Sequence, residues 1–146
     1  MKVRPSAVII KDDCVLTLRY NYQSTNVFAL PGGNPDPGED LTEALKRELQ
    51  EELGIVVSVG DLMICGDVIW NEIKKETHHT VFKAVIVSGI PELNPSETTA
   101  LEIKWLPVPS LSSHLLYPNF GNEITSCIQN SQSLGYLGKA NQPYIS

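Results

Sequence analysis

The chain has 146 residues, of which 42% are hydrophobic and 19% charged, and its formal net charge is −6 at pH 7. This length and composition fit one domain over residues 1–146 and exclude a disordered or fibrous chain. The acidic balance excludes a nucleic-acid partner, and the lack of a long apolar run or a signal peptide predicts a cytoplasmic protein with no membrane partner.

Short strands and turns are predicted for the first part of the chain. Apolar runs predict strands over residues 5–12 and 14–18, joined by a hairpin turn. Residues 20–26 are predicted to be a polar connection, and residues 27–30 a further short strand. The dense prolines and glycines of residues 31–38 rule out regular structure and predict a shaped loop.

A helix over residues 40–53 is predicted by its strong helix formers, with Asp40 or Thr42 as cap and Gly54 as a left-handed stop. After it, β-branched and aromatic runs predict strands, and two later segments predict short helices. The predicted strands are 55–59, 62–70, 79–87 and 101–106, the helices are 109–116 and 123–129, and the order of the tail 131–146 stays open. Strands without regular alternation with helices indicate an α+β fold.

Three carboxylates of the predicted helix, Glu48, Glu51 and Glu52, fall within an arc of about 100° at helical spacing. Like charges so close repel one another and need a partner. Hard divalent cations such as Mg²⁺ prefer carboxylate oxygens and keep places for phosphate oxygens. The cluster therefore predicts a metal-assisted phosphate chemistry, and the alternative is that it is only the solvated face of a charged helix.

The spacing of residues 33–55 resembles the signature of the Nudix hydrolase family at every fixed position. Those positions are Gly33, Glu39, Arg47, Glu48, Leu49, Glu51, Glu52, Gly54 and Ile55. The resemblance implies an α/β/α sandwich around a mixed β-sheet, in which this box forms a loop, a helix and a second loop. It also implies an activity, the metal-assisted attack of water on a phosphorus atom of a diphosphate.

The resemblance assigns the metal ligands and the supporting residues of the box. It implies that Glu48, Glu51 and Glu52 bind Mg²⁺, for which Mn²⁺ would substitute, together with the carbonyl oxygen of Gly32. Arg47 is expected to orient a glutamate by charge-assisted hydrogen bonds.

The remaining box positions are expected to be structural. Glu39 would pair with Arg47 and tie the loop to the helix, while Gly33 and Gly54 would serve backbone geometry.

The proton acceptor stays open between a box glutamate, Glu51 or Glu52, and a glutamate of the later loop 91–99. Glu97 is the candidate in that loop, and the alternative is that it is an ordinary exposed acid.

Residues outside the box are expected to select the substrate. The sequence lacks the downstream proline typical of ADP-ribose hydrolases and the tyrosine typical of dinucleoside-polyphosphate hydrolases, and Trp70 stands in that region. What remains is most similar to the MutT-like branch, which cleaves nucleoside triphosphates, some of them oxidised, to monophosphate and pyrophosphate. The alternatives are a nucleotide-sensing module that does not hydrolyse and a hydrolase of a nucleotide sugar.

Several side chains are candidates for contacts with a small nucleotide substrate. Asn122 or Asn119 would read the base, although Asn122 has the alternative role of capping the helix that follows it. Phe28 and Tyr22 would flank a base, with the core as the alternative place for Phe28. Arg19 is a candidate phosphate ligand, as are Arg4 and Lys83. The chain is expected to be a monomer or a homodimer.

Overall fold

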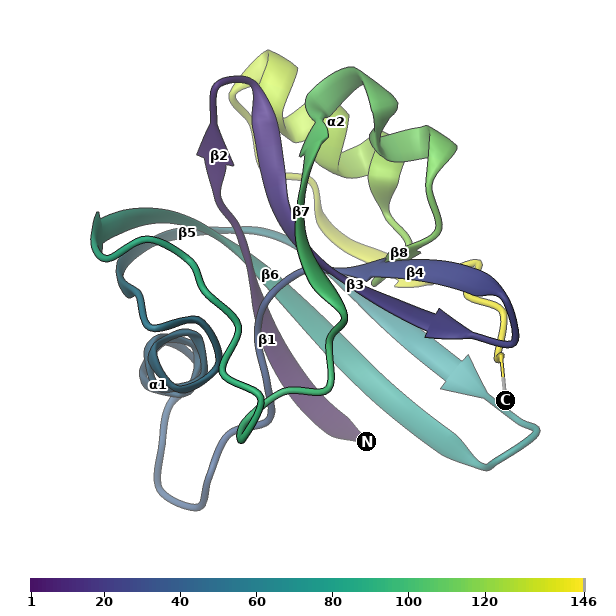
Figure 1. Cartoon of the computed structure of the whole chain (residues 1–146). Coiled ribbons are helices and arrows are strands. Elements are labelled where there is room, and N and C mark those ends of the chain that lie inside the picture. Colours follow the sequence, from purple (N-terminus) through teal and green to yellow (C-terminus); the bar gives the residue numbers. More distant parts are fainter. Residues whose placement is uncertain (146) are drawn as a thin grey trace.

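Two β-sheets cross over one another, and helical segments cover them on both sides (Figure 1). The computed structural model describes residues 1–145. The N-terminal half begins with strands β1, Lys2–Val8, and β2, Ile10–Lys11. The predicted hairpin turn follows, with positive φ angles at Asp12 and Asp13, 51° and 59°.

The prediction of a polar connection over residues 20–26 is wrong. Strand β3 runs through Cys14–Tyr22 and turns directly into β4, Thr25–Ala29. The turn residues Gln23 and Ser24 have positive φ angles of 50° and 66°, as a tight two-residue hairpin requires. Neither residue is glycine, so the usual sequence signal of this turn is absent.

Helix α1, Leu41–Leu53, confirms the predicted helix with both of its ends. The Asp40 side chain accepts a hydrogen bond from the backbone N–H of Glu43 at 2.8 Å, and the Glu43 carboxylate accepts one from the N–H of Asp40 at 3.1 Å. This reciprocal capping box fixes the start of the helix. Gly54 ends it in the left-handed conformation, φ 67°.

The strands predicted over 55–59 and 62–70 form a single strand, β5, Val56–Trp70, which pairs with β6, Lys75–Ser88. The prediction of a break was wrong because Gly60 and Asp61 are absorbed at register shifts rather than in a loop. Such irregularities let a long strand continue while it bends. The pair forms a long hairpin whose turn lies far from α1 (Figure 1).

The C-terminal third contains short elements. The segment predicted as a helix over 109–116 is a 3₁₀ turn followed by a two-residue strand, so that prediction is wrong in its type and its end. The tail, whose order was left open, adds a strand to β5 up to Lys139, and Ser146 lies outside the described residues. These elements are β7, Glu102–Pro107; η1, Val108–Ser113; β8, Leu116–Tyr117; α2, Gly121–Asn130; and β9, Gly135–Lys139.

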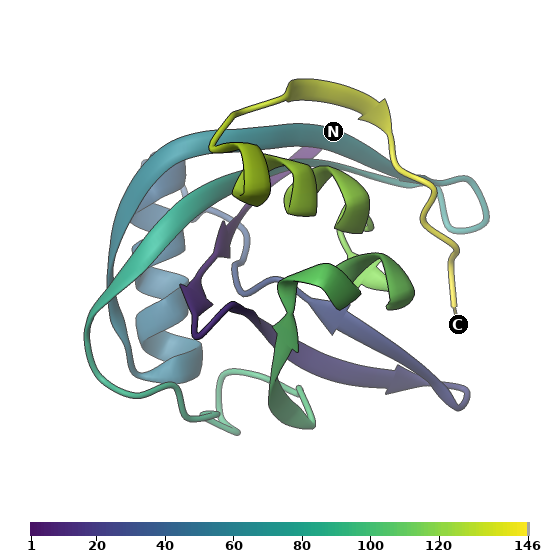
Figure 2. The same ribbon diagram turned by 90° about the horizontal axis from the view of Figure 1, so that it is seen from above.

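One sheet has the strand order β1-β6-β5-β9, and the other has the order β2-β3-β4-β8 with β7 paired to β3. Both sheets are mixed. In the first sheet, β1 runs parallel to β6 and β9 runs parallel to β5. In the second sheet, β8 runs parallel to β4. Helix α1 lies on one side of the strands, whereas η1 and α2 lie on the other (Figure 2).

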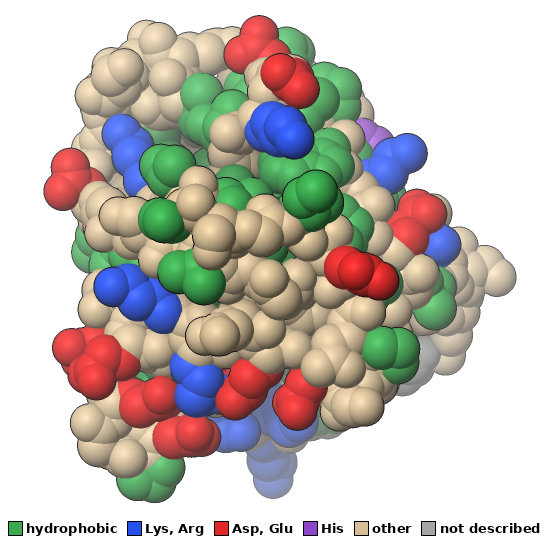
Figure 3. Space-filling model, turned by 60° about the vertical axis from the view of Figure 1, so that its left-hand side comes forward, with side chains coloured by type: hydrophobic (Ala, Val, Ile, Leu, Met, Phe, Trp, Pro, Cys, Tyr) green, Lys and Arg blue, Asp and Glu red, His purple; other side chains and the backbone are tan. Residues whose placement is uncertain are grey.

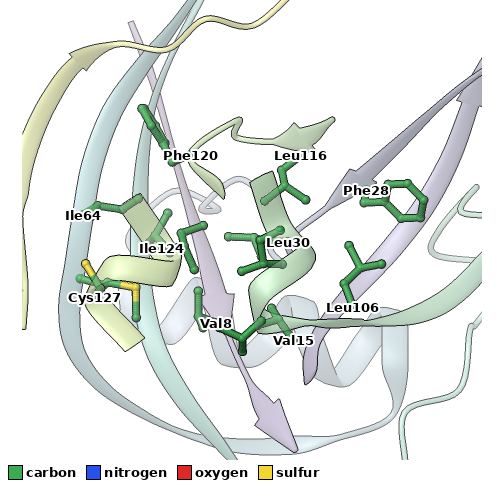
Figure 4. Close-up of a cluster of buried hydrophobic side chains, with 14 residues drawn as sticks. Val8, Val15, Phe28, Leu30, Ile64, Leu106, Leu116, Phe120, Ile124 and Cys127 are labelled. Carbon is green, nitrogen blue, oxygen red and sulfur yellow. The ribbon is translucent and has the colours of Figure 1, made fainter. Parts of the chain in front are cut away.

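Two apolar cores separate these layers. At the end of β1 and just after it, Ala7 and Ile9 belong to the core beneath α1, whereas Val8 belongs to the core beneath α2. The larger core, which includes Leu30 and Ile124, is shown in Figure 4. This alternation of side chains confirms the predicted α+β sandwich with helices on both faces. None of the helices within residues 1–145 is long and apolar enough to span a membrane.

Candidate functional site

Arg47 is the centre of the hydrogen bonds that hold the box together. Its Nε and Nη2 donate to the two carboxylate oxygens of Glu39 at 2.8 and 2.9 Å, a paired geometry that fixes the guanidinium plane. Nη1 donates to Glu48 at 3.0 Å and to Glu51 at 3.1 Å, and Nη2 also reaches the carbonyl of Asn34 at 3.2 Å. The arginine thus connects the loop before α1 to two of the helix carboxylates.

Glu48 lies against the backbone of Gly33. A Cβ atom on Gly33 would lie 2.3 Å from Cδ of Glu48, so a larger residue at position 33 would displace the carboxylate. Burial raises the pKa of Glu48 above its ordinary value, although the hydrogen bond from Arg47 opposes the rise. The glycine of the signature therefore makes room for a half-buried acid.

Glu52 is the least compensated carboxylate of the cluster. Burial, followed by the negative charge of Glu48, raises the pKa of Glu52 to about 7, while Arg4 opposes the rise. Glu51 and Glu97 add smaller repulsions. The Glu52 carboxylate has only these electrostatic neighbours and no ion-pair partner among residues 1–145, as expected for a group that is completed by a cation.

The loop after β6 brings Glu97 to the end of α1. The backbone N–H of Asn94 donates to the Glu52 carbonyl at 2.9 Å, and its side-chain amide donates to the Glu51 carbonyl at 3.1 Å. The N–H of Glu97 donates to the Asn94 carbonyl at 2.9 Å, which closes a tight turn. The loop is thereby attached to the box, and Glu97 is exposed near Glu52.

Gly32 lies where the loop before α1 meets β1. The N–H of Ala7 donates to the carbonyl of Pro31 at 2.9 Å, and the N–H of Gly33 donates to the carbonyl of Pro5 at 3.2 Å. A Cβ atom on Gly32 would lie 2.2 Å from the Pro5 oxygen. Only glycine fits this close approach of two backbones, which positions the Gly32 carbonyl next to the box.

The chemistry of the donor set fits a hard divalent cation. Clustered carboxylates with raised pKa values carry uncompensated negative charge that a cation would neutralise. No three Asp, Glu, His or Cys side chains within residues 1–145 are already arranged as a complete metal-binding group. Arg47 holds one oxygen of Glu48 and one of Glu51.

Acidic side chains gather in the lower part of the face shown in Figure 3, at the height at which α1 and the preceding loop lie in Figure 1. Apolar side chains gather above them on the same face. Lysine and arginine side chains lie among these acidic ones, and further acidic side chains lie at the top and on the right of this face.

An aromatic cavity of about 550 Å³ opens between the two sheets. Its walls come from five segments: β1, the β3–β4 hairpin, the turn end of the β5–β6 hairpin, β8 and the C-terminal segment. Tyr117 stacks on Trp70 with ring centroids 5.9 Å apart, and Tyr144 meets Trp70 edge-on at 5.4 Å. Flat aromatic walls of this kind suit a planar ring such as a nucleobase. The aromatic residues that line it are Tyr20, Tyr22, Trp70, Tyr117 and Tyr144.

Two residues predicted to contact the substrate, Arg19 for a phosphate and Phe28 for a base, lie outside the walls of this cavity. Phe28 is buried in the larger core, where it meets His114 edge-on at 5.0 Å. Arg19 is paired with Glu102 at 2.9 Å. Tyr22 does line the cavity, and its contact with a base stays a prediction.

The two asparagines predicted to read a base also lie outside the cavity walls. Asn119 uses its side chain internally, because its oxygen accepts from Leu116 at 3.1 Å and its amide donates to the carbonyl of Asn141 at 2.9 Å. Asn122 is exposed in the first turn of α2. The alternative that Asn122 caps this helix is wrong, since Phe120 occupies the cap position. Base recognition by either asparagine stays a prediction.

Sequence reasoning missed most of the cavity because its walls come from five separate segments. Tyr20 belongs to the predicted polar connection over residues 20–26, and Tyr144 belongs to the tail, for which the sequence predicts no structure. The only local signal was the alternation of Tyr20 and Tyr22, which places both rings on one face of a strand. Arg4 is one of the three cations that the sequence offers as phosphate ligands. It lines the cavity, and its charge acts on Glu52.

Comparison with known proteins connects this geometry to one family. The NUDIX domain family matches residues 2–125 of the chain. An ADP-ribose pyrophosphatase of Methanocaldococcus jannaschii is 39% identical over 62 residues, which are 42% of this chain. The aligned part spans only 37% of the length of that relative.

Solved structures show the same architecture. A NUDIX hydrolase from Nitrosomonas europaea superimposes with a TM-score of 0.73 at 20% identity, covering 90% of this chain and 91% of its own. A MutT NUDIX hydrolase from Burkholderia pseudomallei gives a TM-score of 0.65 at 27% identity, covering 74% of this chain and 84% of its own. The relatives thus include more than one kind of diphosphate hydrolase.

Proposed function

Because the chain belongs to the NUDIX domain family, we propose that it is a pyrophosphohydrolase that cleaves the diphosphate linkage of a nucleotide derivative with the help of a divalent cation. The observation that carries this proposal is the cluster of Glu48, Glu51 and Glu52 on one face of α1. Arg4, whose charge acts on Glu48 and Glu52, lines the aromatic cavity between the sheets and so connects it to the cluster. Such a cluster next to a cavity for a planar ring suits a substrate that combines a base with phosphates.

The cation is Mg²⁺, with Mn²⁺ as a substitute. We propose that Glu48, Glu51 and Glu52 hold it together with the carbonyl oxygen of Gly32. When bound, it would polarise a phosphoryl oxygen and offset the charge that develops there.

The residues of the chain position the reaction and accept its proton. Arg47 keeps Glu48 and Glu51 in place through its hydrogen bonds, and Glu39 fixes Arg47. The oxygen of a water molecule forms a bond to phosphorus, the bridging oxygen leaves with the other phosphate group, and the proton passes to a carboxylate. Glu52 is our first candidate for that carboxylate, and Glu97 is the second.

The proposed substrate is a nucleoside triphosphate, including one with an oxidised base, which yields a nucleoside monophosphate and pyrophosphate. The size and aromatic walls of the cavity support a nucleobase, and the likeness to a MutT NUDIX hydrolase supports the MutT-like branch. A nucleotide sugar or ADP-ribose is the second candidate, because the M. jannaschii relative is an ADP-ribose pyrophosphatase. A sensor that binds without hydrolysis would not need the complete set of glutamates.

The test is a panel of nucleoside triphosphates, an oxidised guanine nucleotide, nucleotide sugars and ADP-ribose, each incubated with Mg²⁺ and analysed by ion-exchange chromatography. We expect turnover that chelation removes and that Glu52→Gln reduces by about 10²- to 10³-fold. Glu92→Gln is the matched control, because it removes one exposed acid beside α1 that lies outside the cluster. Binding without turnover by the wild type would contradict the hydrolase proposal and favour the sensor.

A further inference from the structure

A second cavity of about 510 Å³ adjoins the aromatic cavity and has a different chemistry. It is lined by four cations, Lys2, Arg4, Lys74 and Lys75, and by a single carboxylate, Glu76. The whole chain has only 11 lysines and arginines and a net charge of −6, so four cations around one hollow are a marked local excess. Residues shared by both cavities are Arg4, Trp70, Lys75 and Tyr117.

The lysines of this second cavity, which we call the lysine cavity, outnumber its single carboxylate and are not paired with it. Within residues 1–145, Lys2, Lys74 and Lys75 form no ion pair. Two of them are positioned by the hairpin turn between β5 and β6, where Lys74 adopts a positive φ of 52°. A concave surface with one sign of charge concentrates ions of the opposite sign. The lysine cavity is therefore suited to an anion.

Arg4 supplies an independent sign of a missing ligand. Its Nη2 donates to the Leu30 carbonyl at 3.1 Å, and its guanidinium lies 5.3 Å from the ring centre of Tyr117. Its other terminal nitrogen, Nη1, is buried and has no hydrogen-bond partner. A buried donor of a charged group without a partner is costly, so a ligand acceptor at this point would relieve it.

The position of Arg4 connects the two cavities to the box. The residue lines both cavities, and its charge acts on Glu48 and Glu52. Asn34 also lines the lysine cavity, and its carbonyl accepts a hydrogen bond from Arg47. The lysine cavity is thus next to the loop that precedes α1.

We propose that the lysine cavity binds the end of the substrate remote from the base, that this end is anionic, and that Arg4 contacts the phosphates between the two ends. The inference rests on the proposed hydrolase function and narrows it. Terminal phosphates carry the charge that Lys2 and Lys74 would attract, whereas the hexose of a nucleotide sugar is neutral. The lysine cavity therefore selects a nucleoside triphosphate over a nucleotide sugar with the same base.

The experiment compares pairs of substrates that share a base, GTP with GDP-mannose and UTP with UDP-glucose. The variant is the double substitution Lys2→Ala and Lys74→Ala, because these two lysines line only the lysine cavity. We expect the variant to raise KM for the triphosphate about tenfold, as the loss of two charge contacts would, and to leave KM for the sugar nucleotide within about twofold. The matched control is Lys11→Ala with Lys104→Ala, two exposed lysines elsewhere.

Equal effects of the double variant on both members of a pair, or no effect on either, would overturn the lysine-cavity proposal while leaving the hydrolase function intact. If the wild type hydrolyses neither member, the nucleotide panel decides the proposed function, and calorimetric titration with tripolyphosphate decides the lysine cavity alone. Binding that the wild type and the control show and the double variant loses would support the anion site. Binding that all three share, or that none of them shows, would overturn it.

Discussion

The box and the two cavities are built in opposite ways. The box consists of one continuous segment, residues 33–55, whose side chains are joined by hydrogen bonds centred on Arg47. The cavities are assembled from the first strand, two hairpins, the short strand β8 and the tail, which are distant in sequence. The proposed chemistry is therefore local in sequence, whereas the proposed substrate recognition depends on the completed fold.

This difference has an energetic counterpart. Charges in the box are compensated by neighbours within a few residues, and the exception is Glu52, whose pKa rises to about 7 because burial and Glu48 oppose its charge. Polar groups on the cavity side are less well satisfied. The buried polar side-chain atoms without a partner within residues 1–145 belong to Arg4, Ser6 and His79 of β1 and β6. A cation would compensate the charge of Glu52, and a polar ligand or water would satisfy the unpaired groups on the cavity side.

Among residues other than the proposed metal ligands, the largest expected effect comes from breaking the hydrogen-bond network of the box. Arg47→Ala removes the hydrogen bonds that orient Glu48 and Glu51, and we expect kcat/KM to fall about 10- to 100-fold, the usual cost of removing a group that orients metal ligands. Arg47→Lys should not restore activity, because a single ammonium group cannot donate to Glu39 in the paired geometry. Steady-state kinetics with the preferred nucleotide measures both.

Lys46→Ala is the control for this prediction, because Lys46 is exposed and directly precedes Arg47 on the same helix. It should leave kcat/KM unchanged. Full activity of Arg47→Ala would show that the carboxylates find their positions without the arginine.

A second prediction concerns His79, which lies on the cavity side. It is fully buried beside Tyr117, with ring centroids 4.7 Å apart. Burial, reinforced by the charges of Arg4 and His78 and opposed by Asp67, lowers the pKa of His79 to about 3. Because the unfolded pKa is about 6.5, neutral His79 stabilises the fold above that pH, and this contribution is lost as the pH falls toward 3. Between pH 7.5 and 5 the free energy of unfolding should fall by about 2 kcal/mol from this residue.

Urea unfolding at the two pH values measures this change, and His79→Phe, which keeps an aromatic ring at this position, should reduce the pH dependence by the same amount. If that variant does not fold, NMR of the wild-type imidazole decides the question. A His79 ring that titrates between pH 5 and 8 would contradict the prediction.

The sequence predicted local features well and distant ones poorly. The helix 41–53 could be predicted with both ends because its cap Asp40 and its stop Gly54 are adjacent to it. The hairpin at Gln23 and Ser24 could not, because cross-strand pairing imposes positive φ angles on residues that seldom adopt them. The tail strand β9 could not either, since only the edge of β5 gives it a partner.

The same limit applies to the candidate site. The box could be assigned from spacing, since i, i+3 and i+4 positions share a helix face whatever the rest of the fold. The cavity residues could not, because nothing in the sequence places Tyr144 beside Trp70 or Lys2 beside Lys74. Asn119 shows the same limit, since the sequence does not reveal that its side chain is hydrogen-bonded to the backbone of Leu116 and Asn141.

A third prediction separates geometry from stability within the box. Gly33→Ala places a methyl group against the Glu48 carboxylate, and we expect kcat/KM to fall about tenfold with little change in stability, since a side chain can move and the backbone need not. Gly38→Ala should lower stability and leave kcat/KM unchanged. Position 38 has space for a methyl group, but its φ of 89° is unfavourable for alanine. That backbone strain should cost about 1 kcal/mol of stability without loss of activity. Kinetics and urea unfolding of both variants provide the measurement, and parallel losses in the two would contradict it.

The smallest expected effect tests whether the tail contributes to substrate binding and not to the chemical step. Tyr144 lines the aromatic cavity from a segment beyond the matched residues 2–125, and the tail is held there because Trp70 Nε1 donates to the Gln142 carbonyl at 3.1 Å. Tyr144→Ala should raise KM for the preferred nucleotide about fivefold, which corresponds to about 1 kcal/mol from one partly exposed aromatic contact, and change kcat less than twofold. Leu134→Ala, an exposed apolar residue of the same tail outside the cavity walls, should change neither. A fall in kcat at constant KM would instead place the tail in the chemistry, and the division between a local box and a distributed recognition surface would then be wrong.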